Sequence, residues 1–188
     1  LQGGCAFEVL RPTSFEPKPA GWTIAQGDLG LTTVQMKTPD IRRMHAHARN
    51  IAGIAVDAEL TRTPWGAETF YLRDFDDTLF QVLEAEDWFE RPKHPSGGVM
   101  GCTVGVSSID RAMKLYGELM GYEVVLFDET GVFEDWKHLP GGQERSRDLG
   151  RGVGVGASVA AHGGPRRVEA RARAKVLIGA TLRDRKGR

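Results

Sequence analysis

Two stretches of this chain match each other at a constant spacing of 68 residues, and this internal repeat restricts its fold more than any other feature. The match has no gap, and it pairs Ile41 with Ile109 and Gly53 with Gly121. A spacing that preserves both the apolar positions and the glycine after them indicates a duplicated supersecondary unit. The sequence therefore predicts two equivalent units built from the same order of elements.

The first unit has the pattern of a β-α-β-β-β run. Near alternation of apolar and polar residues predicts strands at residues 29–37, 58–63, 68–72 and 78–84. Between the first two, Asp40 opens a helix over residues 41–51, and Gly53 ends it. A separate strand is predicted at residues 5–11, before the unit begins.

The second unit follows residues 88–97, which contain two prolines and a glycine and are predicted to be a linker. A strand at 100–106 leads to Ser107, the expected N-cap of a helix over 109–119 that ends at Gly121. Strands are then predicted at 122–128 and 131–136.

The zero net charge of the whole chain conceals two oppositely charged parts. Residues 1–144 contain 13 Lys and Arg against 22 Asp and Glu, whereas residues 145–188 contain 12 basic and 3 acidic residues. Because residues 145–175 are rich in Gly, Ala and Arg, we expect 145–188 to be a flexible basic tail, in which only 175–182 could order as a strand or short helix. Its arginines can neutralise nucleic-acid phosphates, but no aromatic residue lies among them, which argues against nucleic acid as a partner.

Several motifs in this order resemble the vicinal oxygen chelate superfamily, which includes glyoxalase I, extradiol dioxygenases and bleomycin-resistance proteins. The run VGVSSID at 104–110, followed by LY at 115–116 and LMGY at 119–122, is similar to the opening strand and helix of the family. The run FYLRDFDDTLFQ at 70–81 resembles the family's closing turn and strand, with Asp77 where glycine is usual. The resemblance implies an α+β fold whose repeated β-α-β-β-β units form a curved, cup-shaped mixed sheet.

The resemblance also implies a division of the chain. Residues 1–87 correspond to the C-terminal portion of a first domain, in which 28–87 is one complete unit. Residues 98–144 correspond to the start of a second unit, so the chain is expected to be part of a longer two-domain protein. The alternative is an α+β sandwich that is merely duplicated.

Members of this superfamily hold a divalent metal (Zn, Mn, Fe or Ni) in the cup, through His, Glu or Gln side chains. The resemblance implies Glu8 and Gln81 as metal ligands of this chain. At the two other matching positions Thr33 and Gly101 offer no imidazole, so the metal site is expected to be depleted and no metal is expected to bind tightly. In a longer parent protein a metal remains part of the expectation.

Aromatic residues on or beside the strands are candidates for the substrate pocket, namely Trp65, Tyr71 and Phe133. Core packing explains the same residues equally well. His138 lies near a Pro-Gly-Gly turn, where it can reach the rim of a cup or be an ordinary loop histidine.

The leading functional hypothesis is a small-molecule-binding protein of this superfamily, related to a metal-dependent glyoxalase-type lyase or an extradiol-type dioxygenase. The alternative is a non-catalytic module that sequesters its ligand, as resistance proteins do. We expect a homodimer that completes the cup. No membrane span is expected, because no apolar run reaches ~18 residues. A cytoplasmic location is expected, because two cysteines are too few for a disulfide scaffold.

Overall fold

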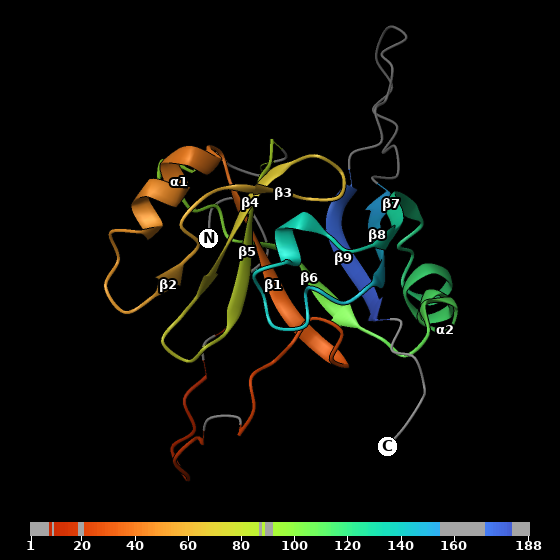
Figure 1. Cartoon of the computed structure of the whole chain (residues 1–188), viewed down its shortest axis with the longest axis horizontal. Helices are drawn as coiled ribbons and strands as arrows, with labels where there is room; N and C mark the ends of the chain where they lie inside the picture. Colours follow the sequence, from red (N-terminus) through yellow and green to blue (C-terminus); the bar gives the residue numbers. More distant parts are fainter. Residues whose placement is uncertain are drawn as a thin grey trace, which may run out of the picture.

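A computed structural model of the chain describes residues 8, 10–18, 21–86, 88, 92–154 and 172–181, with the backbone only for 151–154 and 172–181. These residues form one curved mixed sheet flanked by two helical segments (Figure 1). Within this described part, no helix has the length and apolar character that crossing a membrane requires.

The first unit has the predicted order of elements. The expected strand at 58–63 is replaced by two short strands on either side of Asp57–Leu60. The elements are β1 (Gly30–Thr38), α1 (Ile41–Ala48), β2 (Ala55–Val56), β3 (Thr61–Arg62), β4 (Glu68–Arg73) and β5 (Leu79–Glu84).

The second unit repeats this order with longer connections between its strands. Its helix is a short α-helix that continues as a π-helical turn, and the strand expected at 131–136 is a 3-10 turn instead. The elements are β6 (Val99–Gly105), α2 (Ile109–Met113), η1 (Lys114–Leu119), β7 (Val124–Gly131), η2 (Glu134–Trp136), β8 (Ser146–Gly154) and β9 (Ala172–Thr181).

The two helices begin in the same way at positions 68 residues apart. The Asp40 side chain accepts a hydrogen bond from the Arg43 amide, and the Ser108 side chain accepts one from the Arg111 amide. The predicted N-cap at Ser107 is therefore wrong by one residue, because the extended residue before the helix is Ser108. The stop at Gly121 is confirmed, because this glycine follows the C-cap Met120 and has a φ of 74°. Helix α1 ends at Ala48 and not at residue 51, so Gly53, with a φ of 85°, lies in the turn beyond the helix.

The strand order shows how the two units combine. It runs β2-β4-β5-β1-β6-β9-β8-β7, with β3 paired to β4. In each unit the first and last strands pair in parallel, β1 with β5 and β6 with β9. The first strands of the units, β1 and β6, pair antiparallel. The second unit therefore extends the sheet of the first.

Two strands lie within the stretch expected to be a flexible tail. β8 pairs with β7 on one side and with β9 on the other, so its backbone hydrogen bonds are used in both directions. Leu149 is buried on β8 against Ile109. The expectation of a flexible tail is corrected for 146–154, because pairing with two neighbouring strands stabilises this stretch although it is poor in apolar residues. β9 covers most of 175–182, the stretch for which a strand or short helix was considered. The predicted tail beyond these two strands lies outside the described residues.

The strand expected at 5–11 is also corrected for the residues described there. Glu8, Leu10 and Arg11 belong to no strand. The other residues of this prediction are not among the described ones.

Both helices cover the same face of the sheet. Helix α1 packs Ile41, Met44 and Ala48 on a buried cluster that includes Phe70, Leu72, Phe80 and Val82. Helix α2 packs on Val104 and Leu149. Val34 of the α1 cluster pairs with Cys102, two residues from Val104 on β6, so the two clusters share one face. The opposite face, which we call the inner face, carries the alternate residues, including Tyr71, Gln81 and Asp148.

Candidate functional site

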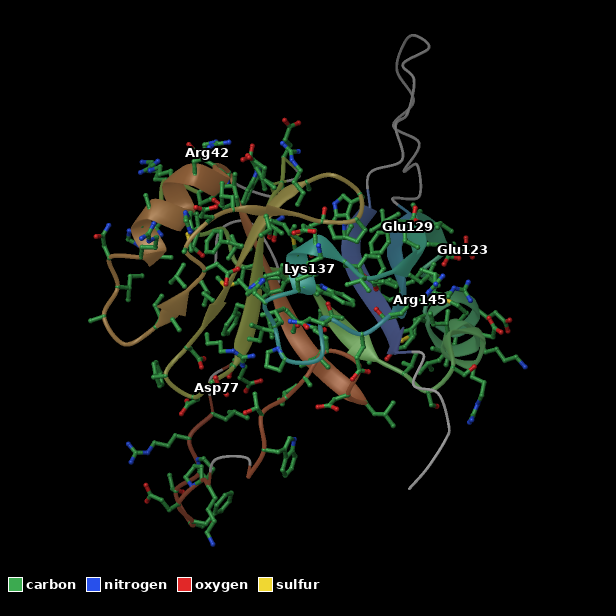
Figure 2. The ribbon with its side chains drawn as sticks, in the orientation of Figure 1. Arg42, Asp77, Glu123, Glu129, Lys137 and Arg145 are labelled. Carbon is green, nitrogen blue, oxygen red and sulfur yellow. The ribbon has the colours of Figure 1, made fainter. Side chains whose placement is uncertain are left out.

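The inner face is crossed by the connection between β7 and β8, residues 132–145, which we call the crossing segment. It leaves the second unit and packs on the first, where Phe133, Trp136 and Leu139 form a buried cluster with Tyr71 and Leu79. Figure 2 shows Lys137 at the end of η2, on the ribbon that passes in front of β1 and β5. The site is therefore built by both units.

A buried hydrogen-bonded group lies where this segment meets β4. The Tyr71 hydroxyl donates to Asp135 Oδ2 at 3.0 Å, and the Trp136 indole N–H donates to the Tyr71 hydroxyl oxygen at 3.0 Å. Asp135 is 1% exposed, and burial raises its pKa from 3.8 to about 7 although the Tyr71 hydrogen bond opposes the shift. The pKa of Tyr71 is raised well above 10 by burial first and then by the charge of Asp135. Near neutral pH Asp135 can therefore hold or release a proton.

A second contact between the units lies at the rim of this group. His138 Nε2 is 2.9 Å from Asp57 Oδ1, and the His138 ring meets the Tyr71 ring edge-on at 5.8 Å between centroids. The other carboxylate oxygen of Asp57 accepts a hydrogen bond from the Tyr71 amide at 2.8 Å. His138 thus lies at the rim, one of the two positions considered from the sequence, and it ties the crossing segment to the strand that carries Tyr71.

A second buried carboxyl lies on the same face. Asp148 projects from β8 on the side opposite Leu149, and it is 1% exposed. Burial and then the charge of Asp135 raise the pKa of Asp148 well above the ordinary carboxyl value. A second buried carboxyl, whose ionisation the charge of Asp135 disfavours, therefore lies on this part of the inner face.

Buried amides continue the polar character of the inner face across β5 and β1. Gln35 and Gln81 are register partners on these strands, and Gln35 Nε2 donates to Gln81 Oε1 at 2.9 Å. Tyr71 is in turn the register partner of Gln81. A row of polar side chains thus runs from β4 to β1.

The three predicted pocket residues fall into two groups. Tyr71 and Phe133 belong to the buried cluster under the crossing segment. Trp65, 37% exposed, stacks instead on Phe127 of β7 at 4.6 Å between ring centroids. Trp65 comes from the β3–β4 turn, so a residue of the first unit packs here on the second unit. The crossing segment makes the reverse contact, from the second unit to the first.

The two predicted metal ligands occupy very different environments. Glu8 is exposed and outside the sheet, whereas Gln81 is buried on β5 with its carbonyl oxygen engaged by Gln35. Thr33 is buried on β1, and Gly101 on β6 has no side chain. In the described ranges, no group of three or more His, Cys, Asp or Glu could hold a metal ion. The residues at these positions therefore do not fit the metal that the resemblance implies.

Sequence reasoning missed the two buried acids, Asp135 and Asp148. Acidic residues in a charged stretch ordinarily indicate a solvated surface. The available signal was the position of Asp135 between the aromatic residues Phe133 and Trp136, which is unusual for an exposed turn.

Comparison with known proteins gives no close relative. No protein-family model and no curated protein matches the sequence. A solved structure of a glyoxalase I variant from Zea mays is 14% identical, with a TM-score of 0.48 over 86% of this chain and 47% of that chain. Glyoxalase I from the same plant is 13% identical, with a TM-score of 0.45 over 84% and 44%. The chain thus spans about half the length of these structures.

A third solved structure is similar along nearly its whole length. It is a Streptomyces coelicolor methylmalonyl-CoA epimerase variant in complex with 2-nitronate-propionyl-CoA, 15% identical, with a TM-score of 0.43 over 82% of this chain and 99% of that chain. Because these three TM-scores are all below 0.5, the fold is described from the strand order and strand pairing of this chain alone.

Proposed function

We propose that this chain is a small-molecule-binding protein of the vicinal oxygen chelate type, whose ligand meets the inner face at Tyr71 and Asp135. One observation carries the proposal. A tyrosine of the first unit and an aspartate of the second unit are hydrogen-bonded at 3.0 Å on the face that both units build. Concave sites with a few convergent polar groups among aromatic side chains are typical of ligand sites.

The chemistry of this pair is that of an acid and a base. Because the pKa of Asp135 is about 7, both its protonated and its ionised forms exist at neutral pH. Tyr71 stays protonated, since its own pKa is raised, and can donate a hydrogen bond to a ligand oxygen or to Asp135. If the chain is an enzyme, we therefore expect proton transfer to or from the bound ligand at Asp135.

The metal-dependent alternative, a glyoxalase-type lyase or an extradiol-type dioxygenase, would need ligands beyond Glu8 and Gln81. We expect the chain to bind Zn²⁺, Mn²⁺ or Fe²⁺ only weakly and to lack glyoxalase and ring-cleaving activity. A one-to-one complex that is tight in calorimetric titration and is lost in Glu8→Ala would restore the metal-dependent reading. A non-catalytic, ligand-sequestering module remains the second candidate, and binding without turnover of the same probe would favour it.

The binding proposal is tested with catechol, a planar probe with two adjacent oxygens. We expect calorimetry to detect catechol binding, and we expect Tyr71→Phe to weaken it about fivefold because one hydrogen bond is removed. Asp76→Asn, in the exposed β4–β5 turn, is the matched control and should change nothing. Equal affinities in the wild type and Tyr71→Phe would contradict the placement of the ligand.

A homodimer and a cytoplasmic location stay predictions. Both units of the described sheet come from one chain, so a second copy is not needed to build the inner face. Light scattering of the purified chain measures its mass in solution directly.

A further inference from the structure

Four oxygen atoms near the crossing segment have no hydrogen-bond partner in the described part of the chain. They are Asp135 Oδ1, both carboxylate oxygens of Asp148 and the hydroxyl oxygen of Ser146. The three residues are buried, with exposed fractions of 1%, 1% and 4%. Buried polar atoms in folded proteins are nearly always paired, so this group requires an explanation.

The three side chains belong to one region of the inner face. Ser146 and Asp148 are two residues apart on β8, so their side chains project from the same face of the strand. Asp135 comes from the crossing segment, which leads directly into Ser146. The charge of Asp135 is among the causes that raise the pKa of Asp148, so the two carboxyls are close enough to interact.

Every unpaired atom in this group can accept a hydrogen bond, and three of the four belong to carboxyls. A ligand that brings N–H donors would satisfy these oxygens in the ionised form of the acids, and a positive charge would favour that form. Ser146 adds a hydroxyl, which can donate as well as accept a hydrogen bond. Its burial without a partner is an observation independent of the acidic pair.

The aromatic side chains beside Asp135 favour the same kind of ligand. The Phe133 and Trp136 rings meet at 5.1 Å in a T-shaped arrangement, and Tyr71 lies in the same cluster. Aromatic rings together with carboxylates are the groups with which proteins bind organic ammonium ions. A metal ion is less suited, because no group of three or more His, Cys, Asp or Glu in the described ranges could hold one.

We infer that Asp135, Asp148 and Ser146 receive a protonated primary amine of the ligand. The inference rests on the proposed function, since it places the ammonium group beside the Tyr71–Asp135 pair. A primary ammonium offers three N–H donors, which suit the acceptors of this group. His138, which is 39% exposed and contacts the Tyr71 ring, is the partly exposed residue beside this pair.

The test compares two probes of nearly equal size, benzylamine and benzyl alcohol, titrated calorimetrically into the full chain at pH 8. We expect benzylamine to bind at least about tenfold more tightly, because charge-assisted hydrogen bonds are the stronger class. Asp148→Asn should remove this preference while leaving benzyl alcohol within about twofold. Asp76→Asn is the matched control. Circular dichroism checks the folding of each variant, and Ser146→Ala gives a second, milder loss should Asp148→Asn not fold.

Equal affinities for the two probes, or a preference that survives both Asp148→Asn and Ser146→Ala, would overturn the inference. So would Mn²⁺ binding that depends on Asp148 and is not displaced by benzylamine, because the group would then be a metal site. If catechol binds in a Tyr71-dependent manner but benzylamine does not bind, only this inference fails. If neither probe binds, the proposed function fails as well.

Discussion

Replacing Asp135 with asparagine should stabilise the protein above neutral pH, although it alters a buried, hydrogen-bonded residue. The asparagine Oδ1 can still accept the Tyr71 hydroxyl, so the contact at 3.0 Å is retained. What the variant removes is the ionisation of a carboxyl that is 1% exposed. A buried charge without a cationic partner destabilises the folded state.

The magnitude follows from the pKa. Burial raises the pKa of Asp135 from 3.8 to about 7, so between these values the folded state binds more protons than the unfolded state. The stability that this group contributes is complete below pH 4 and is lost as the pH rises through 7. At 1.36 kcal/mol per unit the loss is about 4 kcal/mol, as an upper value. Asp135→Asn should avoid this loss.

The assay is urea denaturation of the wild type and Asp135→Asn at pH 4, 5, 6, 7 and 8. The difference in unfolding free energy should be near zero at pH 4 and should approach about 4 kcal/mol in favour of the variant at pH 8. Asp76→Asn, which changes an exposed acid, should follow the wild type throughout. A difference that stays constant with pH would refute the reasoning, because Asp135 would then be ionised in both states over the whole range.

Three further substitutions test the packing around the site. Phe70→Ala should lower the unfolding free energy by about 3–5 kcal/mol in urea denaturation, because Phe70 is fully buried beneath α1. Gly141→Ala should lower the melting temperature more than Gly53→Ala does, although both glycines have positive φ. A Cβ at 141 would lie 2.5 Å from the Gln26 backbone oxygen, whereas a Cβ at 53 would have no heavy atom within 4 Å. Trp65→Ala should cost about 1 kcal/mol in the same denaturation assay through the lost stacking on Phe127, and an unchanged midpoint would contradict this contact.

The repeat made the first part of each unit predictable. β1 and β6, and the two helix starts, follow the constant spacing because each must fit the same neighbours in its own unit. The 68-residue spacing holds as far as β2 in the first unit and the start of β7 in the second unit. β8 could not be predicted from composition, because Ser146, Arg147 and Asp148 look like a charged loop until β7 and β9 supply the pairing.

The site was only partly predictable for the same reason. Tyr71 and Phe133 were named from their aromatic character, but nothing in the local sequence indicates that Asp135 would meet Tyr71 across 64 residues. Contacts of this kind depend on where the crossing segment goes after it leaves β7. Periodicity describes a single element and carries no information about such a path.

The contacts at the site arise where the two units differ. The parts that keep the 68-residue spacing build the sheet and place α1 and α2 on one face. The connections that do not keep this spacing contact the other unit. Trp65 of the first unit stacks on Phe127 of the second, and Asp135 of the second unit accepts a hydrogen bond from Tyr71 of the first. Two identical units would place the same side chains at both ends of the sheet, so an aspartate could not face a tyrosine at one end only. The acid–tyrosine pair is therefore a product of the divergence between the units, and it depends on the length and path of residues 132–145.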